Sequence, residues 1–205
     1  MDLRRLLNES PDALVEWPDP DSERREQRIR IQLAAWASDI AATLNARYGD
    51  LVDLRVGAMT FPTRQLWVSE YAYQLPTAPA GPAALEVEPL SPLSIRTGRV
   101  RIEDVLVTNR AAHGQLLSTD GHLRSAVTDG SGRAVGLYVG PHSLALVQFW
   151  IEPHQSHALP VLIGTASVVP DLGYAVPPGQ WGLVIELGTD SGSLLSAPIE
   201  ITITP

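Results

Sequence analysis

Five histidines are the side chains in this sequence best suited to metal binding or proton transfer. All of them lie in or beside predicted turns: His113, His122, His142, His154 and His157. His154 and His157, in the segment PHQSH, could approach one another as two metal ligands. However, no carboxylate stands at a fixed spacing from them, and no helix places both on one face. We therefore expect solvated turn histidines, no metal site and no cofactor.

Three acidic turns follow threonine residues, at Asp120, Asp129 and Asp190. Calcium loops place Asp and Asn at alternate positions and close with Glu, and this density of ligands is missing here. Asp-Gly and Asp-Ser are typical of tight hairpin turns, because these residues tolerate positive φ or bond their own backbone. The three turns therefore predict hairpins rather than calcium sites.

The sequence carries no signature of a catalytic nucleophile. The patterns Gly-x-Ser-x-Gly, His-Glu-x-x-His and Gly-x-Gly-x-x-Gly are absent. Glu152 and Glu186 could act as a glycosidase pair, but two exposed glutamates on a sheet more often form only its solvated face. We predict no catalytic residue; a triad assembled from distant strands is the alternative.

The chain contains no cysteine and no lysine, so all 15 basic residues are arginine. This composition excludes disulfides, thiol catalysis and Schiff-base chemistry. A GC-rich genome would explain the missing lysine, and avoidance of lysine as a modification target is the alternative.

Charge and hydropathy limit the classes of partner. The formal net charge is −8, and acids outnumber arginines in both halves of the chain. Neither nucleic acid nor an anionic membrane is expected to bind such a surface. No apolar run reaches the ~18–20 residues of a membrane span, and the first residues lack the apolar segment of a secretory signal. We expect a cytoplasmic protein.

The elements expected before residue 51 are helices. Ser10 and Pro11 suit the start of a short helix, PDALVEW, and Asp21 or Ser22 suits the start of a second. Apolar residues of the second helix recur every three or four positions and predict one buried stripe, made of Ile29, Leu33, Trp36, Ile40 and Leu44.

After residue 51 the apolar period changes to two. Alternation predicts strands over residues 52–56 and 67–75, joined by a turn at PTRQ. Residues 76–84 are rich in proline and uncharged, which predicts a semi-rigid linker. We therefore divide the chain into an N-terminal helical and hairpin region at 1–75, a linker at 76–84, and a third part at 85–205.

Residues 85–205 show roughly nine short strands separated by turns. The candidates lie near residues 85–88, 100–108, 114–118, 123–128, 134–139, 144–152, 158–163, 179–188 and 196–204. Short strands with turn signals every ~8–12 residues are typical of an antiparallel β-sandwich. The fold class expected is mainly β, with an antiparallel sandwich after an α-helical and β-hairpin region.

The strand near residues 144–152 is apolar on most of both faces. Phe149 and Ile151 lie on one face, and Leu144, Leu146 and Trp150 lie on the other. A sandwich strand normally shows water one polar face. We expect the N-terminal helix to cover the face of Trp150; a second subunit or another protein is the alternative.

Aromatic residues Trp67, Tyr71 and Tyr73 share one face of their predicted strand. Such a stripe could bind a carbohydrate or a peptide, and an interdomain packing surface is the favoured interpretation.

Four segments of residues 100–188 follow one another in a recognisable order: VTNRA, AVTDGSGRAVG, FWIEPHQSHALPV and YAVPPGQWGLVIEL. This order resembles bacterial immunoglobulin-like domains, and it is similar to the intracellular proteinase-inhibitor-like (BsuPI-type) family first known from Bacillus. The sequence departs from that pattern at Trp181, where Tyr is commoner, and at His154, where Gly is commoner. The resemblance implies an immunoglobulin-like sandwich, and it raises protease inhibition as a function.

We expect a non-catalytic protein-binding module, acting as an adaptor, regulator or assembly component. The partner would be another protein, with a homo-oligomer as an alternative. The long apolar connection from Ser167 to Pro177 is the candidate binding surface, through Pro170, Leu172, Tyr174 and Pro177. The rival functions are a hydrolase with its site between the N-terminal region and the sandwich, a protease inhibitor, and a carbohydrate-binding module.

Overall fold

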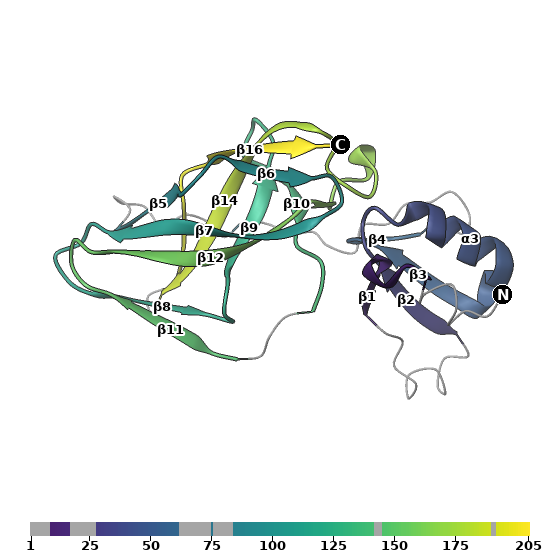
Figure 1. Ribbon diagram of the computed structural model, residues 1–205, viewed down its shortest axis with the longest axis horizontal. Helices are drawn as coiled ribbons and strands as arrows, with labels where there is room; N and C mark the ends of the chain where they lie inside the picture. Colours follow the sequence, from purple (N-terminus) through teal and green to yellow (C-terminus); the bar gives the residue numbers. More distant parts are fainter. Residues whose placement is uncertain (1–8, 17–27, 62–74, 76–83, 142–144, 190–191) are drawn as a thin grey trace.

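The computed structural model describes residues 9–16, 28–61, 75, 84–141, 145–189 and 192–205. These residues form a four-stranded sheet near the N-terminus and a twelve-stranded sheet after it. The smaller sheet and the α-helix beside it lie at one end of the molecule, and the larger sheet occupies the other end (Figure 1). The protein is therefore mainly β, as expected.

The N-terminal elements enclose a small core of their own. In chain order they are η1 (Pro11–Ala13), β1 (Leu14–Glu16), β2 (Ile29–Leu33), α3 (Ser38–Tyr48), η2 (Gly49–Leu51), β3 (Val52–Val56) and β4 (Met59–Thr60). The strand order is β1-β2-β3-β4, and β2 and β3 are parallel and connected through α3. A parallel pair needs such a crossover, so this is a βαβ unit. Leu33, Leu44 and Leu54 are among its buried residues.

The predicted helix through Ile29 and Leu33 is wrong, because these residues belong to strand β2. A spacing of four residues fits one face of a helix and also one face of a strand, so the apolar stripe was ambiguous. β-Branched Ile29 and Ile31 favour the strand. Pairing with β3 then buries Ile31 and Leu33. Within the described part of the expected helix, only Ser38–Tyr48 is helical.

One further N-terminal expectation needs correction. The predicted helix that begins at Pro11 is a single 3-10 turn followed by strand β1, whose Leu14 pairs with Leu33 of β2. Strand β3 forms a hairpin with β4 through Gly57, at φ 59°, and the predicted turn at PTRQ lies outside the described residues. The predicted strand 67–75 and linker 76–84 lie almost wholly outside the described residues, so the domain boundaries stay a prediction.

The larger sheet contains every strand predicted after residue 84, together with three short ones. Its elements are β5 (Leu85–Pro89), β6 (Leu93–Arg96), β7 (Val100–Asn109), β8 (Gln115–Thr119), β9 (Leu123–Thr128), β10 (Ala134–Leu137), β11 (Val147–Ile151), β12 (Ser156–Gly164), β13 (Ala166–Ser167), η3 (Pro170–Leu172), β14 (Gly179–Thr189), β15 (Gly192–Leu195) and β16 (Ile199–Thr204). Strands β6, β13 and β15 were not expected.

The pairing of these strands is mixed, so the expected antiparallel sandwich is not confirmed. The main path runs β11-β8-β14-β9-β12-β7-β5, with β16, β15 and β10 attached to β14 or β9. Strands β9 and β12 are parallel, and so are β6 and β16. Turn signals report only pairs of strands that follow one another in sequence, whereas these two pairs join distant segments.

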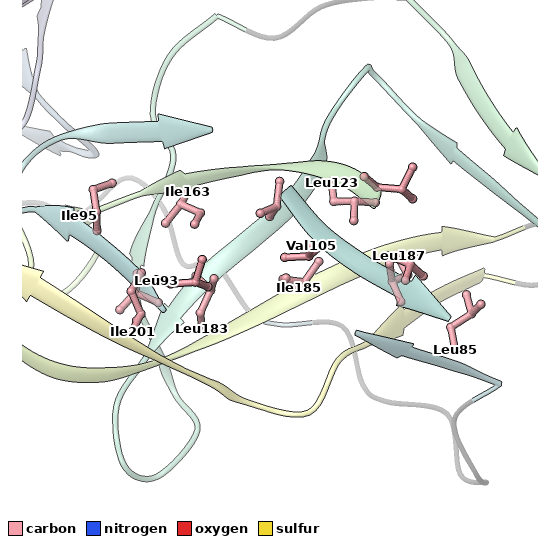
Figure 2. Close-up of a cluster of buried hydrophobic side chains, with 14 of the residues drawn as sticks. Leu85, Leu93, Ile95, Val105, Leu123, Ile163, Leu183, Ile185, Leu187 and Ile201 are labelled. Carbon is pink, nitrogen blue, oxygen red and sulfur yellow. The ribbon is translucent and has the colours of Figure 1, made fainter. Parts of the chain in front are cut away.

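The core of the larger sheet is built from side chains of nearly every strand. In Figure 2 the side chains of Leu93, Ile163, Leu183 and Ile201, which come from four strands, approach one another. All four are almost completely buried. Burying such a side chain contributes ~1.5–3 kcal/mol each relative to exposure.

A buried amide joins the ends of β7 and β11. Asn109, the last residue of β7, is fully buried. Its Nδ2 donates to the carbonyl oxygens of His113 at 2.8 Å and Ile151 at 3.0 Å, and its Oδ1 accepts from the N–H of Ala111 at 2.9 Å. One side chain therefore supplies partners for three backbone groups at one end of the sheet.

Among the residues that the structure describes, no helix is long and apolar enough to cross a membrane. The cytoplasmic location stays a prediction.

Candidate functional site

Strand β11 leaves two large apolar side chains in solvent. Phe149 and Ile151 pack toward the core, whereas Trp150 is 52% exposed and Leu146, just before the strand, is 72% exposed. The expectation that the N-terminal helix covers this face is wrong. Helix α3 buries Ala41 and Leu44 in the N-terminal core, and β11 lies at the far end of the molecule from it (Figure 1).

The exposed indole of Trp150 lies against Gly114. Its ring lies directly over Gly114, so a Cβ at position 114 would collide with it. Across the strand pair, Trp150 faces Leu116 of β8. An exposed aromatic ring offers a large apolar contact surface for binding.

A groove of about 430 Å³ lies beside Leu146. Its walls come from the ends of β8, β9 and β14 and from the chain before β11, and they comprise Ser118, Thr119, Asp120, His122, Leu123, Arg124, Ala145, Leu146, Glu186 and Gly188. A Cβ at Gly188 would come within 2.8 Å of the Ser118 carbonyl oxygen. A larger residue there would therefore press against the strand that forms one wall of the groove.

Two carboxylates and one guanidinium give the groove its charge. Arg124 Nη2 lies 3.7 Å from Asp120 Oδ2. Glu186 Oε1 accepts a hydrogen bond from Ser193 Oγ at 2.6 Å, and among the described residues Glu186 forms no ion pair. The two carboxylates and one guanidinium therefore give the groove one negative charge in excess.

The groove contains serine and histidine, but the described residues do not bring them together. No hydrogen bond joins His122 with Ser118 or Glu186 in the described part of the chain. A nucleophile needs a base within hydrogen-bond reach, and the described residues of the groove show no such pair.

The other histidines are dispersed. His113 is hydrogen-bonded with Gln115 at the surface, His154 and His157 are exposed, and His142 lies outside the described residues. Within residues 9–16, 28–61, 75, 84–141, 145–189 and 192–205, no three His, Asp or Glu side chains are grouped to hold a metal ion. His154 has φ 61°, a left-handed conformation that explains why glycine would suit this position.

The structure places the four residues of the predicted binding loop in different surroundings. Leu172 packs against the core of the larger sheet, and Tyr174 packs against the N-terminal core. Pro177 is half-buried, and its carbonyl oxygen accepts the indole N–H of Trp181 at 3.0 Å. Pro170 is exposed. That these four residues bind a partner stays a prediction.

Tyr174 also joins the two parts of the molecule. Its ring stacks on Phe61, with centroids 6.1 Å apart and planes at 9°. Nearby, the Arg99 guanidinium lies over the Trp36 ring, 4.1 Å from its centroid. Ala58 packs with Ala126 and other residues of the larger sheet.

A cleft of about 350 Å³ lies at this junction. Its described lining includes one carboxylate, Asp12, one guanidinium, Arg99, and the phenol of Tyr138, with neither serine nor histidine. The described residues therefore give the hydrolase alternative no catalytic pair in this cleft.

Burial of Tyr174 makes the free energy of unfolding depend on pH in the alkaline range. Burial raises its pKa to about 12, against ~10 for an unfolded tyrosine. The folded state holds the proton more tightly, so stability is complete below pH ~10 and falls as pH rises toward ~12. We expect the free energy of unfolding of Tyr174→Phe, which keeps the ring, to fall less steeply between pH 9 and 11.5 than that of the wild type. Urea unfolding followed by fluorescence measures this free energy.

The comparison is clean because no lysine or cysteine titrates in this range. Burial, and then the charge of Asp120, also raises the pKa of Tyr138, but Tyr138 is present in both proteins. Parallel pH profiles of the two proteins would contradict the expectation.

Comparison with models of protein families gives no match, and comparison with curated protein sequences gives none either. Solved structures similar to part of the chain include a CARDB domain from Pyrococcus furiosus, with a TM-score of 0.31 and 11% identity, over 59% of this chain and 94% of that one. A PapD-like domain of human CEP192 has a TM-score of 0.27 and 10% identity, over 65% of this chain and 94% of that one. A β-glucosidase from Listeria innocua has a TM-score of 0.33 and 9% identity over 59% of this chain, which spans 16% of the glucosidase.

TM-scores this low carry no argument for a shared fold or function. No family match supports the similarity to the proteinase-inhibitor-like family.

Sequence reasoning found part of this site. Alternation along the strand placed Leu146 and Trp150 on one face, but it did not group Arg124 with Glu186. These two residues are paired across β9 and β14, which are far apart in sequence, and no local pattern signals that contact.

Proposed function

We propose that the chain is a non-catalytic protein-binding module built on an immunoglobulin-like β-sandwich at residues 85–205. We place its binding surface at Leu146, Trp150 and the groove beside them, and name it the β11 surface. The observation that carries the proposal is the exposure of Trp150 at 52% and Leu146 at 72% on one face of an edge strand.

General features of protein interfaces support this assignment. Exposed apolar patches rimmed by polar groups mark interaction sites, and tryptophan is enriched among the residues that dominate binding energy. The β11 surface has both features, since the groove next to Leu146 is lined by Asp120, Arg124 and Glu186. Protease inhibition would be one form of such binding. The carbohydrate-binding alternative depends on Trp67, Tyr71 and Tyr73, and these residues lie outside the described part of the chain.

Affinity capture from a lysate of the native host tests this function. The bait proteins are the full chain and its double variant Leu146→Ser/Trp150→Ser. We expect at least one protein captured by the wild type to be lost, by tenfold or more, from the double variant, because the variant removes the apolar contact area. Quantitative mass spectrometry measures the loss.

The control is Leu51→Ser/Leu90→Ser, which removes two apolar side chains that are 62% and 55% exposed elsewhere. This variant should retain the captured protein. Capture that is equal for the wild type and the Leu146→Ser/Trp150→Ser variant would refute the assignment of the surface.

A further inference from the structure

The cleft between the N-terminal βαβ unit and the larger sheet has the size of a small-molecule site. Its volume is about 350 Å³, and such sites measure ~300–1,000 Å³. Both parts of the molecule line it, and it shares no lining residue with the groove beside Leu146. We propose that this cleft binds a small organic monocarboxylate with an apolar body, a function separate from protein binding at the β11 surface.

The cleft lies at the carboxyl ends of the two parallel strands of the N-terminal sheet. Residues 34–36, which line it, follow directly on β2, and Gly57, which also lines it, follows directly on β3. In open sheets with parallel strands, ligands bind outside the carboxyl ends of the strands. Small-molecule sites also favour the junctions between domains. The cleft satisfies both rules.

A half-buried cation in this cleft selects for an anion. The guanidinium of Arg99 lies over the Trp36 ring, 4.1 Å from its centroid, and both residues line the cleft. Among the described residues, the side chain of Arg99 forms neither an ion pair nor a hydrogen bond. The cation–π contact with Trp36 therefore leaves the N–H donors of the guanidinium without acceptors. An anionic ligand would supply those acceptors and compensate for the hydration that the half-buried cation has lost.

The backbone that carries Arg99 is anchored beside Trp36. Thr165, which is fully buried, donates from Oγ1 to the Arg99 carbonyl oxygen at 3.0 Å, and its N–H donates to the same oxygen at 3.2 Å. The preceding residue, Gly98, has φ 71°, and a Cβ there would lie 2.9 Å from the Cβ of Trp36. The turn with the cation therefore packs directly against the indole that it lies over.

The charges of the cleft suit a ligand with one negative charge rather than two. Its described lining holds one guanidinium, that of Arg99, and one carboxylate, that of the exposed residue Asp12. A carboxylate matches a single guanidinium and can accept two parallel hydrogen bonds from it. A phosphate dianion would bring a second negative charge that no described cation of the cleft balances, and Asp12 would repel it.

The other walls of the cleft favour an apolar body on the ligand. Leu14, Val15 and Val139 line the cleft and are half-buried. An apolar ligand surface placed against these side chains would release the water that now contacts them. The hydroxyl of Tyr138 already donates its proton to the Pro141 carbonyl oxygen at 2.9 Å, so this phenol adds ring surface to the wall rather than a donor.

Binding of matched carboxylates and amides to the full chain tests the inference. The probes are benzoate, phenylacetate, cyclohexanecarboxylate and hexanoate, the primary amide of each, and inorganic phosphate. We expect at least one carboxylate to bind with a dissociation constant on the order of 1 mM or tighter. Its amide should bind at least tenfold more weakly, because it lacks the charge that Arg99 would pair with. Isothermal titration calorimetry measures these constants.

Three results of this titration would overturn the inference. One is that none of the four carboxylates binds. Another is that each amide binds as tightly as its carboxylate, since the guanidinium would then contribute nothing. The third is that phosphate binds more tightly than every carboxylate.

A pair of arginine variants locates the bound carboxylate. Arg99→Gln removes the guanidinium of the cleft and should weaken binding at least tenfold. Arg47→Gln is the matched control, because the Arg47 guanidinium also lies over an aromatic ring, 5.6 Å from the centroid of Tyr48, but does not line the cleft. It should change the dissociation constant less than twofold. Asp12→Asn should bind the carboxylate at least as tightly as the wild type, because it removes a like charge. Loss of binding in Asp12→Asn but not in Arg99→Gln would contradict the inference.

A second pair of variants leaves the contact between Arg99 and Trp36 in place. Val100 lines the cleft and is 48% exposed, so Val100→Glu adds a negative charge to the wall and should weaken carboxylate binding at least fivefold. Ile102→Glu adds the same charge two residues away on the same face of β7, at a side chain that is 53% exposed and does not line the cleft. It should weaken binding less than twofold. Equal binding by the two glutamate variants would show that the carboxylate binds elsewhere, and the inference would fall.

Discussion

Asn109→Ala is expected to lower the free energy of unfolding by about 3 kcal/mol. The side chain of Asn109 donates to the carbonyl oxygens of His113 and Ile151 and accepts from the N–H of Ala111. Alanine leaves these backbone groups without that partner at a fully buried position. Each buried polar group left unsatisfied costs ~1–3 kcal/mol. Urea unfolding followed by fluorescence measures the change.

Asn45→Ala is the matched control, because Asn45 is a half-buried residue of helix α3 and alanine is the better helix former. It should change the free energy of unfolding by less than about 0.5 kcal/mol. Asn109→Asp should be at least as damaging as Asn109→Ala, since a carboxylate cannot donate to the two carbonyl oxygens. If Asn109→Ala matches Asn45→Ala in stability, the buried amide is not holding the strand ends together.

Gly164→Ala is expected to cost about 2–3 kcal/mol of stability for a different reason, overpacking. A Cβ at Gly164, the last residue of β12, would run into the backbone of Tyr138 and lie 2.5 Å from the Leu137 carbonyl oxygen. These atoms are main chain, so no side chain can rotate away. The added methyl group must push β10 and β12 apart.

Gly130→Ala provides the comparison, since a Cβ there meets no atom within 4 Å. We expect its stability to stay within about 0.5 kcal/mol of the wild type, or to rise slightly through the smaller entropy of its unfolded chain. Thermal unfolding followed by circular dichroism should show a lower midpoint for Gly164→Ala alone. Equal midpoints for the two variants would show that β10 can shift without cost.

Local patterns in the sequence predicted the strands of the larger sheet well because turn residues separate them and several of them alternate in side-chain type. The segment from Gln180 to Glu186 shows this alternation, and it lies in β14. The N-terminal part was harder to predict, because Ile29 and Leu33 fit both a helical and a strand period. Its true structure depends on pairing with Val52–Val56, which is a tertiary contact with no local signal.

The candidate site was predictable only in its apolar half. Trp150 stood out because the alternation of its strand left it on a face that should have been polar. The prediction that the N-terminal helix covers that face was wrong. The sequence does not show that the buried side of α3 packs within its own βαβ unit. The charged half depends on Arg124 meeting Glu186 across β9 and β14, and on Gly114 and Gly188 leaving room for their neighbours.

The parallel pairing of β6 with β16 has a consequence for the order in which the protein is made. Strand β6 pairs with β16 alone among the described strands, and β16 is the last of these strands in chain order. The backbone groups of Leu93 and Ile95 therefore have no described strand partner until Ile201 and Ile203 have been synthesised. The described strands of the N-terminal sheet end at Thr60 and can pair early. The larger sheet should close in a later step, because it involves contacts of long sequence separation, which are slow to form.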